Sequence, residues 1–251
     1  MQIVGYDART SDPAAIRLAT DGEIVRETLT AGTDLSYQLG ERRCAGTVDG
    51  DHHVACDDPS APYCDAHTDR WPCARCTGEC DLPLESCREE HAVYLAAFAP
   101  DAFKVGVTRS WRLETRLREQ GADRAAHLRT VADGRIARQI EADIATRVGD
   151  RVRVPTKIRG LHRRVDERAW RDLLDGFEPL QTFTFADDLD LSERPVRETI
   201  LSGTVRGVRG RVLVLDTAGT TYAVDLRDLV GFELTDGTAD RALQSSLGAF
   251  E

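Results

Sequence analysis

Seven cysteines lie between residues 44 and 87 of this 251-residue chain, and they constrain its fold more than any other feature. The segment around them is rich in Asp, Gly and Pro and poor in aliphatic residues. Such a segment cannot bury enough apolar surface to form a core of its own. Bound metal ions or disulfide bonds must therefore hold it in shape.

Two pairs of these residues have the spacing of metal-binding knuckles. Cys64-Asp-Ala-His67 is a C-x-x-H pair and Cys73-Ala-Arg-Cys76 is a C-x-x-C pair, and together they offer four ligands for tetrahedral zinc. The remaining cysteines form a second set of four: Cys44, Cys56, Cys80 and Cys87. We therefore expect a module over residues 44–90 with two structural zinc ions. A crossed arrangement, in which the first and third pairs along the chain share one ion, fits the spacing too.

Disulfide bonds are the main alternative to zinc. The number of cysteines is odd, and the N-terminus MQIVGYDART lacks the basic and then apolar pattern of a signal peptide. No stretch approaches the roughly 20 apolar residues of a membrane helix. We therefore expect a cytoplasmic protein with reduced cysteines. His52, His53 and His91 are substitute ligands if Cys56 does not bind metal.

The charge of the chain is unevenly distributed. The net charge is −10, and 31 of the 33 basic residues are arginine, the exceptions being Lys104 and Lys157. An acidic, lysine-poor composition resembles that of salt-loving archaea, whose excess carboxylates keep protein surfaces hydrated. Residues 104–171 nevertheless hold 18 basic and 9 acidic side chains. This asymmetry indicates a nucleic-acid-binding face, unless the arginines are spread evenly around helices and paired with carboxylates.

Hydrophobic periodicity predicts an α+β fold with four parts. The parts are N-terminal strands over residues 1–43, the zinc module, a three-stranded α/β unit over 91–175, and a C-terminal sheet or small barrel over 176–251. Expected strands cover residues 16–20, 23–30, 35–42, 92–98, 103–108, 125–131, 198–208, 210–218, 220–226 and 230–236. Expected helices cover 112–121, 134–149 and 161–175. We expect the strands at the two ends of the chain to pair into one split antiparallel β domain.

Two of the expected helices carry a charged residue beside an apolar stripe. Ile136, Ile140 and Ile144 recur at helical spacing, which predicts a buried stripe with Glu141 at its edge. In the same way, Arg116 flanks Leu113 and Leu117. Glu141 and Arg116 can therefore both reach a cleft beside the sheet.

The same region resembles a known nuclease superfamily. Ala92-Val93-Tyr94 followed by Lys104-Val105-Gly106 is similar to the paired strand motifs of the GIY-YIG nucleases, and Arg116 and Glu141 match the Arg and Glu of that superfamily. The whole chain resembles the family catalogued as domain of unknown function 2797. The resemblance includes the N-terminal strands, the cysteine cluster, the R-L-x-E-Q-G string at residues 116–121 and a C-terminal sheet.

The superfamily resemblance implies roles for individual residues. Its catalytic set in this chain is Tyr94, Lys104, Arg116 and Glu141, with Glu141 holding Mg²⁺ or Mn²⁺ and Arg116 neutralising charge on the phosphoryl group. Its nucleic-acid-binding set is Gly106, Thr108, Arg109, Arg112 and Arg116. Lys104 stands where the superfamily has a tyrosine, and a lysine serves as a general base only if its pKa is strongly lowered.

Two hypotheses for the function follow. The first is a zinc-containing protein that binds DNA or RNA and acts as a divalent-metal-dependent endonuclease. The alternative is a zinc-stabilised scaffold for protein interaction or regulation, in which the nuclease-like unit is inert. Salt-dependent nucleic-acid binding distinguishes them. In the C-terminal strands, Arg206, Arg209 and Arg211 either grip a nucleic-acid backbone or keep an edge strand from aggregating.

Overall fold

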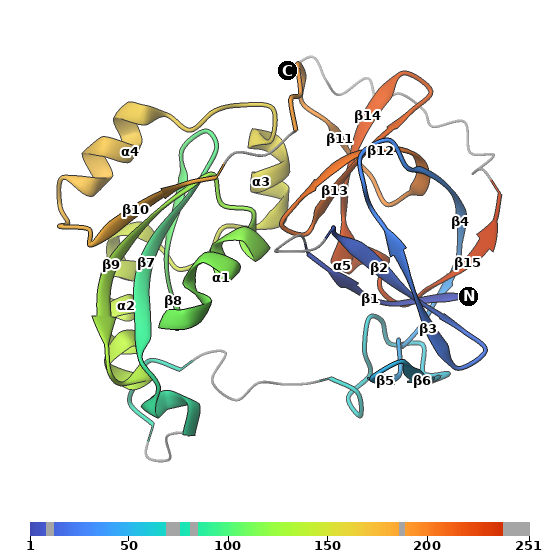
Figure 1. The fold of residues 1–251 in the computed structure, drawn as a ribbon, viewed down its shortest axis with the longest axis horizontal. Coiled ribbons are helices and arrows are strands. Elements are labelled where there is room, and N and C mark those ends of the chain that lie inside the picture. Colours follow the sequence, from blue (N-terminus) through green and yellow to red (C-terminus); the bar gives the residue numbers. More distant parts are fainter. Residues whose placement is uncertain (9–12, 69–75, 81–84, 186–188, 238–251) are drawn as a thin grey trace.

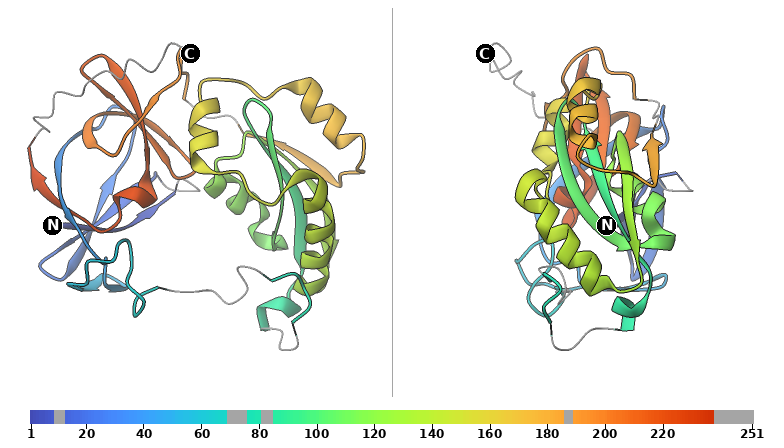
Figure 2. Two further views of the ribbon diagram at one scale, coloured as in Figure 1. Left: turned by 180° about the vertical axis from the view of Figure 1, so that it is seen from behind. Right: turned by 90° about the vertical axis from the view of Figure 1, so that its left-hand side faces the viewer.

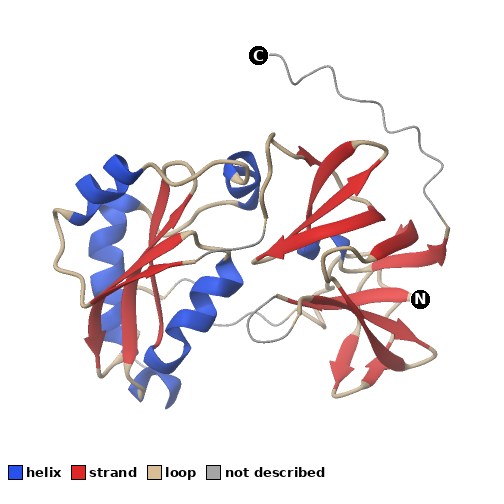
Figure 3. Ribbon diagram, turned by 45° about the horizontal axis from the view of Figure 1, so that its top comes forward, coloured by secondary structure: helices blue, strands red, loops and turns tan. Residues whose placement is uncertain are grey.

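The structure is a computed structural model that describes residues 1–8, 13–68, 76–80, 85–185 and 189–237. It has two bodies, namely a β domain made from both ends of the chain and an α/β unit made from its middle (Figure 1). The longer helices belong to the α/β unit, whereas the β domain consists almost entirely of strands (Figure 3). The predicted α+β class with antiparallel sheets is confirmed. No helix in the described ranges is long and apolar enough to cross a membrane.

The β domain contains one sheet, which has eleven strands over the described residues, in the order β11-β14-β13-β12-β4-β15-β1-β2-β3-β6-β5. The N-terminal strands are β1 (Gln2–Asp7), β2 (Ala15–Thr20), β3 (Glu23–Thr28), β4 (Asp34–Arg42), β5 (Thr47–Asp49) and β6 (His52–Val54). The C-terminal elements are β11 (Val196–Arg197), β12 (Leu201–Arg209), β13 (Val212–Thr217), β14 (Thr220–Asp225), the single-turn helix α5 (Leu226–Leu229) and β15 (Phe232–Asp236). β15 pairs with both β1 and β4, and β12 pairs with β4, so the two ends of the chain do share one sheet.

Alternating side chains hold this sheet together. Because successive residues of a strand point to opposite faces, every second residue can enter a common core. Ile3 and Ile16 from the N-terminal strands and Leu213 and Leu215 from β13 are fully buried in the same cluster. The core of the β domain therefore forms only when both chain ends are present.

The α/β unit is built on a second antiparallel sheet in the order β10-β9-β7-β8. Its elements are the 3₁₀ turn η2 (Glu85–Arg88), β7 (His91–Phe98), β8 (Ala102–Arg109), the 3₁₀ turn η3 (Ser110–Arg112), α1 (Leu113–Gln120), β9 (Arg124–Val131), α2 (Gly134–Val148), α3 (Val154–Gly160), α4 (Glu167–Leu174) and β10 (Gln181–Thr184). The described sheet has four strands and not the predicted three, because β10 adds to the edge of β9. β10 is a short edge strand, and it extends the unit beyond residue 175.

Helices cover both faces of this sheet. On one face Ala92, Tyr94 and Phe98 pack with Leu117 of α1. On the other face Val93 and the neighbouring odd-numbered residues of β7 pack with α2 and α4. Figure 2 shows α1 and α2 on opposite sides of the strands. Because β7 is buried on both faces, its sequence HAVYLAAF is a nearly continuous apolar run.

The buried face of α2 differs from the predicted isoleucine stripe. Ile136 is 48% exposed, whereas Ala137 and Ile144 are buried at 0% and 6% exposure. Glu141 is itself buried, at 8% exposure, so it lies on the packed face and not at its edge. The stripe of Gly134, Ala137, Glu141 and Ile144 brings small residues against the sheet, which lets α2 approach β8 closely.

The segment after α2 was also predicted imperfectly. The single helix expected over residues 161–175 begins only at α4, because the carboxylate of Asp166 accepts hydrogen bonds from the N–H groups of Arg168 and Ala169 and caps it there. The preceding helix α3 was missed. It has only seven residues and carries Pro155 in its first turn, which reads in sequence as a helix breaker although proline is favoured at that position.

The two bodies are joined through α3 and the end of β12. Ile158 and Val154 of α3 form one buried cluster with Val212 and Val214 of β13. Next to it, the guanidinium of Arg209 forms an ion pair with Asp123 at 2.8 Å, and both side chains are less than 20% exposed. The interface is therefore an apolar patch with a nearly buried ion pair beside it.

The corrected face of α2 can be tested with two isoleucines on the same helix. We expect Ile144→Ala to lower the free energy of unfolding by about 2–5 kcal/mol, because it leaves a cavity in the core. Ile136→Ala should change it by no more than about 0.5 kcal/mol, because its side chain is largely exposed. Chemical denaturation of the two variants measures both values. Equal losses would contradict this placement of α2.

Candidate functional site

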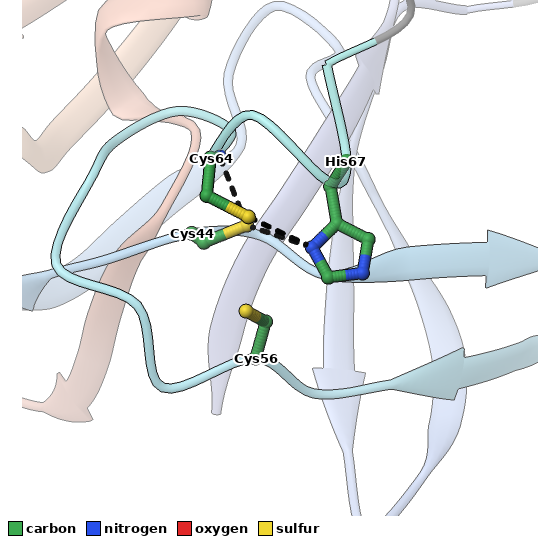
Figure 4. Close-up of side chains that lie close together, drawn as sticks. All are labelled: Cys44, Cys56, Cys64 and His67. Carbon is green, nitrogen blue, oxygen red and sulfur yellow. Dashed lines mark hydrogen bonds between the residues drawn. The ribbon is translucent and has the colours of Figure 1, made fainter.

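Three cysteines and one histidine converge beside the β domain (Figure 4). Cys44 follows β4, Cys56 follows β6, and Cys64 and His67 lie in the next loop. The four ligand atoms all lie within 4.8 Å of one another. Nδ1 of His67 is 3.4 Å from Sγ of Cys44 and 3.2 Å from Sγ of Cys64. Tetrahedral Zn–S and Zn–N bonds would set such atoms about 3.5 Å apart.

The hairpin of β5 and β6 brings these ligands together. It returns the chain from Cys44 so that Cys56 arrives on the same side. Gly46 allows this return, because its φ is +65° and a Cβ atom there would lie 2.1 Å from the carbonyl oxygen of Val54. His53 is used in the hairpin, where its Nε2 lies 2.8 Å from the carbonyl oxygen of Ala45.

The chemistry of this cluster suits a metal ion. Three thiolates and one imidazole form a closed donor set of the kind found in structural zinc sites. Backbone N–H groups of Gly46 and Cys64 donate to Sγ of Cys44 at 3.4 and 3.3 Å. Burial raises the pKa of the Cys44 thiol, but these N–H groups, together with the thiols of Cys64 and Cys56, lower its pKa below the usual value. The cluster could therefore hold a metal ion, and its ligands are consistent with zinc.

The grouping of ligands differs from both predicted arrangements. Cys64 and His67 were expected to join Cys73 and Cys76, or to be crossed with other pairs, but they join Cys44 and Cys56. The physical reason is the β5–β6 hairpin, which places residues 44 and 56 side by side and was not recognised in the sequence. Because Cys56 belongs to the cluster, no substitute histidine is needed.

The later cysteines lie at the α/β unit instead. The N–H of Gly78 donates to Sγ of Cys76 at 3.3 Å, and Arg135 of α2 donates to the carbonyl oxygen of Cys80 at 3.4 Å. Cys87 lies in η2, against the first turn of α2. Cys73 lies outside the described residues. The expected second zinc ion therefore remains a prediction, and with Cys44 and Cys56 in the first cluster the ligands left for it are Cys73, Cys76, Cys80 and Cys87.

The predicted nuclease-like residues share one cleft beside the edge strand β8, which we call the α/β cleft. Its volume is about 630 Å³. It is lined by all the residues that the resemblance marked: Tyr94, Lys104, Gly106, Thr108, Arg109, Arg112, Arg116 and Glu141. The described lining contains seven basic side chains and only two carboxylates, those of Glu141 and Asp150. Several of these cations are paired with carboxylates, among them Arg109 with Glu89 at 3.3 Å and Arg112 with Glu119 at 2.8 Å, so the positive charge of the cleft is smaller than this count.

Gly106 and Tyr94 form the floor of the α/β cleft. They are directly opposite each other on β8 and β7, and a Cβ atom at residue 106 would lie 2.5 Å from the Tyr94 hydroxyl oxygen. Glycine is therefore required here so that the Tyr94 ring can lie across the strand. The hydroxyl accepts a hydrogen bond from Nε2 of Gln120 at 2.7 Å. Burial raises the pKa of Tyr94, so the phenol stays protonated near neutral pH.

Lys104 and Glu141 are the polar groups on the inner side of the cleft. Burial, together with the nearby Arg116, lowers the pKa of Lys104 to about 8. Part of the lysine population is therefore neutral under mildly basic conditions. The carboxylate of Glu141 accepts a hydrogen bond from Arg138 at 2.7 Å and is 11% exposed. This ion pair offsets the cost of burying the carboxylate.

The structure adds one residue that the sequence analysis missed. Trp111, in η3 at the start of α1, is 70% exposed. The guanidinium groups of Arg109 and Arg112 each lie 5.9 Å from its ring, and both arginines line the α/β cleft. The signal in the sequence was the string Arg109-Ser-Trp-Arg112, an aromatic residue between two basic ones.

The three arginines of the C-terminal strands have separate roles. Arg206 pairs with Asp216 at 3.3 Å, Arg209 makes the ion pair with Asp123 between the two bodies, and Arg211 pairs with Asp225 at 2.8 Å. They do not form one cluster at the turn.

Comparison with known proteins supports a family but gives no individual relative. Residues 64–188 match the family model described as "Protein of unknown function (DUF2797)". This supports the family that the sequence motifs indicated, and the matched segment runs from Cys64 through the whole α/β sheet. No curated protein and no solved structure matches the chain.

The metal centre can be tested with two histidines. We expect two zinc ions per chain by mass spectrometry of the purified protein, and His67→Asn should remove one of them because it deletes a ligand. His52→Asn is the matched control, since His52 is exposed and lies outside the cluster. Unchanged zinc content in the His67 variant would show that this cluster does not bind the ion.

Proposed function

We propose that this protein binds the phosphodiester backbone of nucleic acid in the α/β cleft. The observation that carries the proposal is the excess of seven basic side chains over two carboxylates in the described lining of this cleft, within an acidic chain. Guanidinium groups bind phosphate through paired hydrogen bonds, and six of these seven basic residues are arginine. Local positive charge of this kind is the electrostatic mark of a nucleic-acid site.

Trp111 favours nucleic acid over a free phosphate compound. An exposed indole lowers solubility and contributes nothing to the hydrophobic core. Stacking of a base on an aromatic ring contributes about 1–3 kcal/mol to the binding free energy in single-strand-binding proteins. Its ring lies between two cleft arginines, so a base that follows a bound phosphate can reach it. The protein would then bind both the phosphate and the base of a nucleotide.

A salt titration tests the binding. We expect Arg116→Ala to weaken binding of a fluorescent oligonucleotide at low salt about tenfold, because a hydrogen bond to a charged group contributes about 1.5 kcal/mol. The slope of log affinity against log salt should also fall by about 0.7–0.9. Arg168→Ala on α4 is the control, since that side chain is 88% exposed and lies outside the cleft. Absence of binding by the wild-type protein would favour the alternative of a zinc-stabilised scaffold.

Cleavage of the bound strand is the second candidate function, and the lowered pKa of Lys104 favours it. In this reaction water attacks phosphorus, the bond from phosphorus to one ester oxygen breaks, and the proton of the water passes to neutral Nζ of Lys104. The leaving oxygen takes its proton from solvent. Arg116 stabilises the charge that develops on the phosphoryl oxygens.

The carboxylates of the cleft fit a divalent cation in this reaction. Glu141 and Asp150 both line the cleft near Lys104, and Mg²⁺ is commonly held by one or two carboxylates together with substrate phosphates. When bound, Mg²⁺ or Mn²⁺ neutralises charge on the phosphoryl oxygens. Glu141 would have to loosen its ion pair with Arg138 to take part.

The pH dependence of cleavage tests the assignment of Lys104. Because the neutral amine is the base, the rate with Mg²⁺ or Mn²⁺ should rise with pH and level off above about 8. Lys104→Arg keeps the positive charge but stays protonated, so it should bind normally and lose cleavage. Glu141→Gln should also lose cleavage, measured on labelled DNA and RNA. Activity unchanged in either variant would exclude this site.

A further inference from the structure

A second, larger hollow lies between the β domain and the α/β unit, and we call it the interdomain groove. Its volume is about 1240 Å³, above the roughly 300–1,000 Å³ of sites for small molecules. Of its described lining residues, ten are basic and five are acidic. Both bodies contribute to this excess of positive charge, with Arg151, Arg153 and Lys157 on one wall and Arg211 and Arg227 on the other.

The groove adjoins the α/β cleft. Arg116 and Arg151 line both hollows, so the two hollows meet at these side chains. Arg116 lies on α1 and Arg151 between α2 and α3, which places the junction at the inner end of the α/β unit. A chain molecule that occupied the cleft could therefore continue into the groove past these two side chains.

Several cations in the groove have no protein anion to neutralise them. Within the described ranges, Arg151, Arg153, Lys157 and Arg227 form no ion pair with a carboxylate. The three arginines are exposed. Lys157 is half-buried, with its Nζ donating to the carbonyl oxygen of Gln120 at 2.7 Å and lying 4.1 Å from the centre of the Phe98 ring. Burial lowers the pKa of Lys157 to about 7, which an anion at this position would reverse.

The shape of the groove is set before any ligand arrives. The apolar contact of α3 with β13 and the ion pair of Arg209 with Asp123 fix the two walls relative to each other. A preformed groove binds without the cost of ordering its walls. Its positive charge and its volume suit a polyanion with regularly spaced phosphates.

We propose that the interdomain groove binds the part of a DNA or RNA strand that extends from the α/β cleft, so that the β domain is the second half of one continuous nucleic-acid site. This inference rests on the proposed function of the cleft. It assigns the β domain a direct role in binding, through Arg227, that neither the zinc ligands nor the nuclease-like residues imply.

A double substitution on opposite walls tests the proposal. Arg153→Ala with Arg227→Ala removes two exposed cations that are not ligands of the zinc cluster and that lie outside the α/β cleft. Binding is measured for a dinucleotide and for single strands of about 16 nucleotides, the upper end of the site size of small barrels. DNA and RNA strands of the same sequence form the two arms. Thermal unfolding confirms that the variant is folded, and Arg168→Ala is the control.

The expected result is a loss confined to the longer strands. The double variant should lower the magnitude of their salt slope by about 1.4, or roughly 0.7 for each phosphate contact, and leave dinucleotide binding unchanged. Full affinity and an unchanged salt slope for the longer strands would overturn the groove while leaving the cleft intact. If the longer strands bind but Arg116→Ala has no effect and the dinucleotide does not bind, the groove stands and the cleft proposal fails. Absence of binding by any strand overturns both.

Discussion

The contact between α3 and the β domain is the interaction on which the candidate nucleic-acid site depends. Ile158 and Val154 pack against Val212 and Val214, and this apolar patch holds two separately cored bodies at a fixed distance. The ion pair of Arg209 and Asp123 also fixes the relative orientation of the two bodies, because a nearly buried ion pair tolerates little misalignment. With this contact in place, Arg116 and Arg151 form the junction of two hollows, and without it they would line only the smaller one.

Positive charge is concentrated in the two hollows, although the chain as a whole is acidic. The protein has a net charge of −10, yet the lining residues that the structure describes in both hollows are predominantly basic. An excess of carboxylates repels polyanions, so the basic hollows are where the proposed nucleic acid would be attracted. Glu141 is buried on the inner side of the α/β cleft, where its carboxylate is paired with Arg138.

Much of this fold could be predicted from sequence, because the strands of the β domain and β7–β9 follow simple alternation or continuous apolar runs. The residues of the α/β cleft could be found because Tyr94, Arg116 and Glu141 stand in a recognisable order. What could not be predicted depends on tertiary contacts. The rotation of α2 follows from packing of Ala137 against the sheet, and the metal grouping follows from a hairpin of two three-residue strands with almost no apolar signal. The interdomain groove cannot be predicted from the sequence, because the residues of its two walls are far apart along the chain.

The pairing of the two chain ends has a consequence for how the protein is made. Gln2 donates a hydrogen bond to the carbonyl oxygen of Gly231 at 3.1 Å, so residues that are far apart in the chain, and are synthesised at different times, meet in one sheet. The α/β unit is contiguous, and domains generally fold as units during synthesis. It can therefore be complete while β1–β6 still lack their partners. During that interval the exposed edges of β1 and β4 depend on local order, and a metal held by Cys44, Cys56, Cys64 and His67 would supply it next to β4.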